Sequence, residues 1–218
     1  MPLLYKYSHV HETFFKKHGE LLWYKKDQLL VWPAEQYPWV YFLVSGYVRS
    51  SFTLSDGTTR IIGFFRPGTT FAQSGSFFGD EGGKLEYTAE TAVSLYRVKR
   101  SDFFMHLGRD PEFAQEYLDM VLRSRIYLIE RIIYQGENGI ERKFARWLLF
   151  MAKHYGTEVK NGCHIYIPLT QTTIANFLHM TRESTNTIMR IFIKKRIIKV
   201  SNKIIHIPDI EKLKRVLA

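Results

Sequence analysis

Short stretches in which apolar and polar residues alternate fill most of the first half of the chain, and turn residues separate them. The Asp56-Gly57 pair is a strong signal for a tight hairpin turn, and Pro67-Gly68 marks another turn. Many short strands joined by turns predict a compact antiparallel β-roll or barrel, followed by a helix over 100–107. The strand-like stretches are 21–32, 40–44, 47–54, 58–65 and 86–98.

A much longer helical pattern follows this region. Asp110 and Pro111 provide an N-cap and a proline for the first helical position, and no helix-breaking residue occurs before Gly136, so we expect a helix of about 25 residues. Apolar residues recur along it at alternating spacings of four and three, which is the seam of a two-helix coiled coil interrupted only by one arginine. We therefore predict a homodimer whose interface contains Leu118, Val121, Arg125, Leu128 and Ile132.

The long helix also has a second apolar face, offset from the first by one residue. Its members are Phe113, Tyr117, Met120, Tyr127 and Tyr134. Packing of the helix against its own β domain is therefore an alternative to the dimer, although both contacts are compatible because they use different faces. A short hinge between Gly136 and Gly139 then leads to an amphipathic helix over 140–155.

Two further helical patterns, with a tight turn between them, occupy the last third of the chain. Thr170 is an N-cap for the first, His179 and Met180 make the turn, and Thr181 caps the second with Ser184 in the capping-box position. The second pattern has polar and basic residues on one side and an apolar side for packing. Its apolar positions are Ile188, Ile191 and Phe192. Two alternating stretches around a Ser-Asn-Lys turn follow, which predicts a helix-turn-helix with a two-stranded wing.

Basic residues are concentrated in this same part of the chain. Residues 140–218 contain 15 Lys and Arg against 5 Asp and Glu, whereas residues 1–139 contain 16 of each, so one end carries the whole net charge of +10. Lys and Arg gain affinity for nucleic acids by releasing counterions from phosphates, so this partition is typical of a sensor or scaffold coupled to a polyanion-binding domain. A solvated basic surface without a partner is the alternative interpretation.

Other features argue against several classes of protein. The single cysteine excludes an internal disulfide and a thiolate iron-sulfur cluster, and Cys163 and His164 point to opposite sides of an extended segment, so they form no catalytic pair. His9 and His11 lie in an N-terminal arm that we expect to be mobile and exposed, so we predict no metal site and no cofactor.

No apolar run suits a membrane span or a secretory signal, which predicts a cytoplasmic protein without a membrane partner. No paired carboxylates, nucleophile constellation or phosphate-binding glycine loop occurs, so we predict no enzymatic activity.

With these elements in order, the chain from about residue 21 onward resembles the Crp/Fnr family of bacterial transcription regulators. The stretch YFLVSGYVRSSFTLSDGTTRIIGFFRPGTTF is similar to the family's β-roll, residues 111–134 to its dimer helix, and LTQTTIANFLHMTREST with KKRIIKVSNKIIHI to its winged helix-turn-helix. The resemblance implies an α+β protein whose N-terminal antiparallel β-roll is a jelly roll like that of cyclic-nucleotide-binding domains. The implied domains are an effector or sensor roll (1–109), a dimerisation helix with its hinge (110–139) and a C-terminal winged helix-turn-helix DNA-binding domain (140–218).

The same resemblance implies the partners and the residues that read DNA. A homodimer is expected on an inverted repeat in double-stranded DNA, with half-sites about one helical turn apart, and RNA polymerase is an expected protein partner. Arg182 and Glu183 stand where the family has a base-contacting Arg-Glu pair, and Thr170 and Gln171 stand where phosphate contacts are expected. The full predicted DNA-binding set is Thr170, Gln171, Thr181, Arg182, Glu183, Asn186, Thr187, Arg190 and Lys194.

Two positions depart from the family pattern. Thr187 stands where many members have a second base-reading Arg, which puts the usual half-site in doubt. His179 stands where the turn usually has Gly, so a positive φ is expected there, at a cost for a residue with a side chain.

The prediction of the effector depends on ligand-binding residues that the chain lacks. Members that bind cyclic nucleotides carry a Gly-Glu-Leu and an Arg-Ser pair in the roll, whereas the corresponding stretches here read FAQS at 71–74 and LEYTA at 85–89, with no cation for the phosphate. Haem sensing needs axial ligands, and no His lies between His18 and His106. The most similar branch in these absences is that of the regulators of organohalide respiration, which sense chlorinated aromatics. We therefore predict a small organic effector, aromatic in this reading, bound between the roll and the long helix by Phe71, Gln73, Tyr87, Tyr127, Arg131 and Tyr134.

Several alternatives stay open at this point. The dimer is constitutive if nothing binds the roll, and a cyclic-nucleotide-responsive regulator of the same family is a further possibility. A non-enzymatic RNA-binding or structural dimer is the alternative from another class, although a wing and a single exposed helix suit the major groove of B-form DNA better than RNA. If an effector binds, we expect it to change how the dimer helices cross, with the hinge at 136–139 converting this into a new spacing of the recognition helices.

Overall fold

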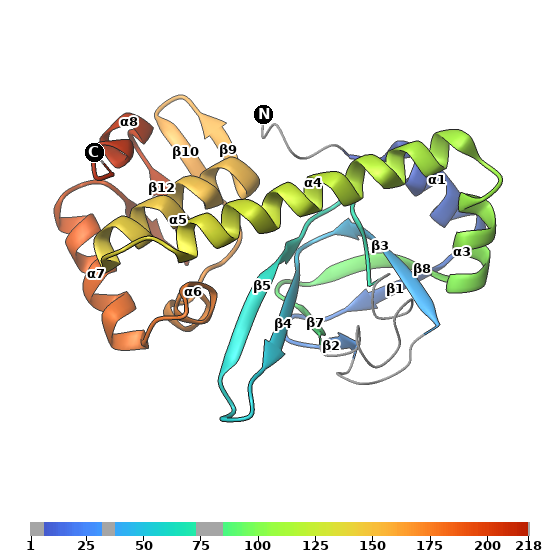
Figure 1. The fold of residues 1–218 in the computed structure, drawn as a ribbon, viewed down its shortest axis with the longest axis horizontal. Coiled ribbons are helices and arrows are strands. Elements are labelled where there is room, and N and C mark those ends of the chain that lie inside the picture. Colours follow the sequence, from blue (N-terminus) through green and yellow to red (C-terminus); the bar gives the residue numbers. More distant parts are fainter. Residues whose placement is uncertain (1–6, 32–37, 73–84, 218) are drawn as a thin grey trace. The chain divides into compact units, whose positions relative to one another are not determined.

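The computed structural model describes residues 7–31, 38–72 and 85–217. They form two compact units, one within Lys6–Leu122 and the other within Arg123–Ala218 (Figure 1). The long helix α4 (Pro111–Gln135) contributes its first half to the N-terminal unit and its second half to the C-terminal unit. Its two ends therefore have different surroundings.

The described part of the N-terminal unit contains two four-stranded antiparallel sheets, which have the orders β1-β8-β3-β6 and β2-β7-β4-β5. Two helices, α1 (His9–His18) and α3 (Arg100–Leu107), accompany them (Figure 1). The strands are β1 (Glu20–Tyr24), β2 (Leu29–Val31), β3 (Trp39–Ser45), β4 (Val48–Thr53), β5 (Thr59–Phe65), β6 (Thr70–Phe71), β7 (Glu86–Ala89) and β8 (Val93–Lys99). This arrangement confirms the predicted antiparallel roll and the helix predicted over 100–107.

Two turns show how the sequence sets the strand boundaries. The predicted hairpin turn joins β4 to β5, with Gly57 at φ 79° and the Asp56 carboxylate accepting a hydrogen bond from the backbone N–H of Thr58 at 2.8 Å. The stretch predicted as one strand over 21–32 is instead split into β1 and β2. Asp27 adopts a left-handed conformation there (φ 67°), which turns the chain between the two strands.

The apolar core of this unit has two parts. One draws side chains from both sheets, and the other packs α1, α3 and the first turn of α4 against β3 and β8. The first contains Val31, Tyr41, Leu43, Phe71, Tyr87 and Leu95, and the second contains Phe14, Phe15, Phe42, Phe103 and Phe113. The aromatic residues of the first half are therefore largely core, and helix α4 begins as part of it.

In the N-terminal arm the sequence interpretation is only partly right. The sequence predicts that His9 and His11 lie in a mobile, exposed segment; His9 is exposed, but both residues belong to α1, which Ser8 caps by accepting from the backbone N–H of His11 at 3.0 Å. The His11 ring is fully buried, with its nitrogens 3.2 Å from Thr70 Oγ1 and 3.2 Å from the carbonyl oxygen of Phe113. Burial lowers the pKa of His11 because it penalises the charged form.

The C-terminal unit combines a helix-turn-helix with a small antiparallel sheet of the order β11-β12-β10-β9. Predicted and observed helices agree closely, whereas the β9–β10 hairpin and α8 were not predicted. The elements are α5 (Ile140–Tyr155), β9 (Gly156–Val159), β10 (Gly162–Ile165), α6 (Gln171–Leu178), α7 (Arg182–Lys194), β11 (Lys199–Ser201), β12 (Ile204–Ile207) and α8 (Ile210–Lys214). Buried side chains of α5, α6 and α7 form the core around Trp147, Phe177 and Phe192. Among the described residues, no helix has the length and apolar character that a membrane crossing requires.

Candidate DNA interface

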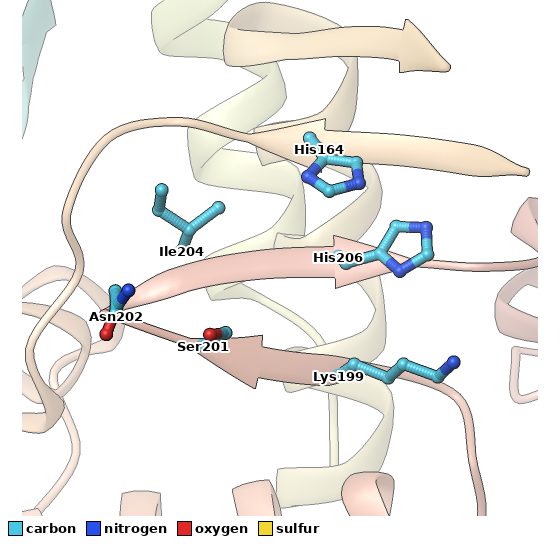
Figure 2. A pocket seen from close by; sticks show the side chains of 6 residues that line it. All are labelled: His164, Lys199, Ser201, Asn202, Ile204 and His206. Atoms are coloured by element: carbon cyan, nitrogen blue, oxygen red, sulfur yellow. The ribbon is translucent and has the colours of Figure 1, made fainter. Parts of the chain in front are cut away.

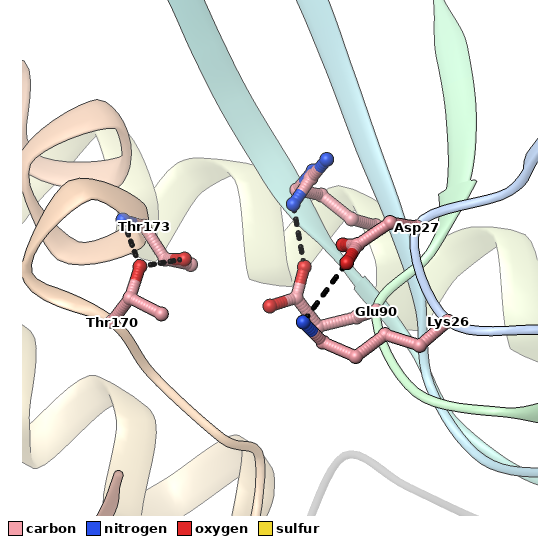
Figure 3. Close-up of polar contacts among 6 residues, drawn as sticks. Lys26, Asp27, Glu90, Thr170 and Thr173 are labelled. Atoms are coloured by element: carbon pink, nitrogen blue, oxygen red, sulfur yellow. Dashed lines mark hydrogen bonds and ion pairs between the residues drawn. The ribbon is translucent and has the colours of Figure 1, made fainter.

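Side-chain caps start both helices of the helix-turn-helix. Thr170 Oγ1 accepts a hydrogen bond from the backbone N–H of Thr173 at 3.0 Å, as Figure 3 shows, and Thr181 Oγ1 accepts from the N–H of Ser184 at 3.1 Å. Between the helices, His179 has φ 55° and ψ 46°, which confirms the positive φ expected at this position. A left-handed residue here turns the chain out of α6 and toward α7.

Helix α7 buries one face and exposes the other. Thr185, Ile188, Met189 and Phe192 are buried, whereas Ile191, which the periodicity placed among the apolar packing positions, is exposed. The opposite face is polar and basic. Of the residues predicted to bind DNA, those that are exposed are Gln171, Thr181, Arg182, Glu183, Thr187, Arg190 and Lys194, and those that are half-buried are Thr170 and Asn186.

One hydrogen bond joins the outer surfaces of the two helices. Gln171 Nε2, at the start of α6, donates to Asn186 Oδ1 on α7 at 3.1 Å. A side-chain amide has two donor hydrogens and an acceptor oxygen, so this bond leaves further groups on both residues for a nucleic-acid partner. The structure thus brings together residues that lie 15 positions apart in the sequence.

The wing adds basic side chains that the predicted set does not include. Strands β11 and β12 meet at a turn where Asn202 and Lys203 have φ of 50° and 66°, and both Lys199 and Lys203 are exposed. In the sequence, the lysine of the predicted wing turn, Lys203, is the signal for this basic surface. Figure 2 shows a hollow on this sheet, and its lining residues are His164, Lys199, Ser201, Asn202, Ile204 and His206. Cys163 is buried on the opposite side of β10 from His164, as the alternation predicts.

Helix α4 carries a row of exposed apolar side chains. The residues predicted at a dimer interface are all exposed, with Ile132 at 71% and Leu118 at 57%. Neighbouring apolar residues extend the row: Leu122, Ile126, Ile129 and Ile133 are exposed as well. The second predicted face behaves differently, because Phe113 at one end and Tyr134 at the other are buried in their respective units. Contiguous exposed apolar surface of this kind marks an interaction site.

The six predicted effector residues fall into two groups. Phe71 and Tyr87 pack together in the roll, with ring centres 5.6 Å apart, and Phe65 lies 4.9 Å from Phe71. Gln73 lies outside the described residues. The other three, on α4, have partners inside the C-terminal unit, and the structure therefore assigns the two groups to different units.

The α4 group is tightly packed. The Tyr155 hydroxyl donates to the Tyr127 hydroxyl at 2.9 Å, and the Tyr134 ring centre lies 5.0 Å from that of Phe150. Burial raises the pKa of Tyr127 well above its ordinary value, and that of Tyr134 as well. Both phenols therefore stay neutral throughout the physiological pH range.

The roll contains a cation, Arg49, which is relevant to the alternative that the roll binds a cyclic nucleotide. Arg49 on β4 donates from Nη1 to Glu90 Oε2 at 2.6 Å, and only 4% of the Glu90 side chain is exposed. Burial raises the pKa of Glu90, and the charge of Arg49 opposes that shift. Figure 3 shows Glu90 near the exposed Lys26–Asp27 pair, whose charged atoms are 3.0 Å apart. Because a buried carboxylate already neutralises Arg49, this guanidinium adds no net positive charge for a phosphate.

Comparison with known proteins agrees with this geometry. A family model described as the cyclic nucleotide-binding domain matches residues 21–110, and one described as the Crp-like helix-turn-helix domain matches residues 142–216. The nitrogen fixation regulation protein FixK of Azorhizobium caulinodans is 31% identical over 153 residues, which cover 67% of this chain and 58% of FixK. The chain thus matches less than two thirds of the length of that relative.

Solved structures share the fold over nearly the whole chain. FixK2 from Bradyrhizobium japonicum has a TM-score of 0.76 at 24% identity, covering 92% of this chain and 98% of that one. CprK complexed with OCPA has a TM-score of 0.70 at 14% identity, covering 94% and 93%. The relatives are transcription regulators and not enzymes. Carrying a cyclic-nucleotide-binding-like roll ahead of a Crp-like helix-turn-helix, the chain belongs to the Crp/Fnr family of DNA-binding transcription regulators.

Proposed function

We propose that the protein regulates transcription as a homodimer that binds a specific inverted repeat and responds to a small organic effector. The observation that carries sequence-specific binding is the exposed polar face of α7, a helix that is capped at its start and buried along its other side. A helix held in this way can enter a major groove without unpacking its own domain. RNA polymerase is the proposed protein partner at the promoter.

In the proposed complex, the first turn of α7 reads the bases. Arg182 donates two hydrogen bonds to guanine O6 and N7, and Glu183 accepts one from cytosine N4. Thr170 and Gln171, at the start of α6, contact phosphate, where the free N–H groups of a helix start also favour an anion. Lys194 near the end of α7 contributes charge rather than sequence preference.

The exposed apolar row of α4 supports the homodimer. Burying one large aliphatic side chain completely stabilises a complex by roughly 1.5–3 kcal/mol, and the row contains several that are mostly uncovered on a single chain. A second copy of the same row is self-complementary around a two-fold axis. That axis would place two α7 helices on the two halves of an inverted repeat.

The aromatic cluster of the roll supports an organic effector. Phe65, Phe71 and Tyr87 pack together inside the roll, an aromatic interior is where a ring compound would bind, and CprK has been solved with OCPA bound. In the proposal, Tyr127, Arg131 and Tyr134 are the α4 residues whose packing responds to the effector. The neutralised Arg49 disfavours a cyclic nucleotide, which is the second candidate because the family model for that domain matches.

Selection of DNA from a random duplex pool, combined with light scattering on a sizing column, tests the proposal. We expect the enriched sequences to be inverted repeats and the mass in solution to be that of two chains. A single-chain mass together with no enrichment would contradict the regulator assignment, and enrichment of RNA in a parallel pool would favour the alternative class. Mass spectrometry of the purified protein, with cyclic AMP as a titrated competitor, then identifies what the roll holds.

A further inference from the structure

The turn of the helix-turn-helix contains a residue in a costly conformation. His179 has φ 55° and ψ 46°, a region that glycine occupies freely and that other residues enter at a cost. Glycine is usual in this turn in the family that the sequence resembles. A histidine at this position therefore calls for a compensating contact of its side chain.

The structure contains such a contact, to helix α4. His179 Nε2 lies 3.4 Å from Nη2 of Arg131. A guanidinium only donates, so the imidazole accepts through an unprotonated Nε2. The distance is long for a hydrogen bond, so the contact depends on other interactions that hold the guanidinium in place.

Those interactions bring α4 against the end of α6. Arg131 is only 7% exposed, and its guanidinium carbon lies 4.7 Å from the centre of the Phe177 ring, within cation–π range. One turn further along α4, Gln135 Nε2 donates to the carbonyl oxygen of Phe177 at 3.1 Å. Phe177 and His179 are both at the C-terminal end of α6, so three contacts from α4 hold this end.

From these contacts we infer that Arg131 is a positioning residue for DNA recognition, which acts through Phe177 and His179. The cap of α7, Thr181, follows His179 by two positions, so the placement of His179 sets where the first turn of α7 begins. That turn carries the proposed base-reading pair. With histidine at position 179, the turn has a less favourable backbone conformation than glycine would allow, but the imidazole makes a contact that fixes the helix-turn-helix to α4.

The inference rests on the proposed function, and it makes a prediction that a purely stabilising contact does not. Fixing α7 to α4 matters most when two copies must meet two half-sites at a set spacing. Loosening the contact should therefore weaken the discrimination against wrong spacing more than it weakens binding to one half-site.

The experiment uses the full chain and the duplex recovered by selection. Affinity is measured for this duplex, for the same duplex with one base pair inserted between the half-sites, and for a single half-site. The variants are Arg131→Ala, His179→Gly and the double variant. We expect the affinity ratio between correct and inserted duplex to fall roughly three- to tenfold in each single variant. Affinity for the single half-site should change less than about twofold, and the double variant should equal Arg131→Ala because Arg131→Ala already removes the contact that His179→Gly breaks.

Two matched controls separate this effect from charge and backbone effects. Arg109→Ala removes an exposed arginine of the N-terminal unit, and Asp27→Gly relieves a left-handed residue there (φ 67°). Both should leave the spacing ratio unchanged. His179→Gly keeps the test decisive if Arg131→Ala fails to fold, because glycine suits the turn and the variant should fold at least as well as the parent.

The outcomes distinguish a failure of the positioning role of Arg131 from a failure of the proposed function. An unchanged spacing ratio in folded His179→Gly, or independent and additive effects of the two substitutions, would overturn the positioning role while leaving DNA binding intact. An equal loss on the single half-site would also overturn it, because the contact would then only stabilise the domain. If the parent protein enriches no duplex at all, the proposed function fails and this inference fails with it.

Discussion

Helices α4 and α7 are both amphipathic, and they leave opposite kinds of face uncovered. Helix α7 buries Ile188 and Phe192 and exposes Arg182, Glu183 and Arg190. Helix α4 buries Phe113 and Tyr134 but exposes an apolar row along its length. An exposed polar face is stable in water and stays available to a polar ligand, whereas an exposed apolar face is stabilised only by a partner. The comparison supports the proposed dimer, in which α4 needs a partner to cover its apolar row and α7 needs none for its own packing.

The largest expected effect comes from placing a charge in the apolar row of α4. Glutamate at Leu128 or Ile132 would bury an unpaired carboxylate in the proposed dimer, so Leu128→Glu and Ile132→Glu should yield single chains and lower operator affinity by more than about 100-fold. Light scattering and gel-shift assays measure this. Met105→Glu, on an exposed apolar residue of α3, is the control and should keep the parental mass. Dimers that persist at micromolar concentration in both row variants would show that α4 is not the interface.

A smaller and more selective loss is expected on α7. Arg182→Ala removes a bidentate contact with guanine, so operator affinity should fall about 10- to 100-fold, and the preference at one base pair of each half-site should disappear. Repeating the duplex selection with the variant reveals the relaxed position. Arg109→Ala controls for the change in net charge. If Arg182→Ala selects the same half-site with the same stringency as the parent, then another residue reads that base.

Removing the cap of α7 should cost less. Thr181→Ala leaves the N–H of Ser184 without its acceptor, Thr181 Oγ1 at 3.1 Å, and should destabilise the domain by about 1 kcal/mol, with a corresponding loss of affinity. Thermal denaturation followed by circular dichroism measures the stability change. Thr157→Ala, at an exposed threonine of β9 that caps no helix, should have little effect. Equal melting temperatures for parent and Thr181→Ala would mean that the cap does not stabilise α7.

The smallest effect is expected at the far end of α7. Lys194→Ala should weaken binding to all duplexes alike, by roughly two- to fivefold, and should reduce the slope of log affinity against log salt by about 1, because one phosphate contact is lost. A salt titration with operator and with random duplex measures both quantities. Lys17→Ala, at an exposed position of α1, provides the control. An unchanged slope would place Lys194 away from the phosphate backbone.

Most of the fold was predictable because its signals are local. Helices α3, α4 and α5 begin and end where periodicity, proline and glycine place them, and the caps Thr170 and Thr181 are in use as predicted. The errors also have physical causes. Helix α1 escaped prediction because its apolar positions make sense only against α3 and α4, and the turn at Asp27 is a left-handed residue other than glycine, which sequence patterns indicate poorly.

The candidate site shows the same difference between local signals, which were predictable, and contacts between distant residues, which were not. The residues of α7 were predictable from one helical face, since exposure follows from periodicity once the opposite side is buried. The environments of Tyr127, Arg131 and Tyr134 were not, because their partners come from α5, α6 and the residues that follow α6, which lie far along the chain. No spacing rule connects Arg131 with Phe177 and His179.

By itself, the sequence determined the order and type of most elements, the basic C-terminal third and the two faces of each long helix, because these depend on neighbours within a turn or two. Only the tertiary structure decided which of those faces is covered, that His11 is buried, and that the end of α6 is held by α4. Such contacts join residues distant in the chain, and their free energy depends on the packing of whole elements rather than on local residue preferences.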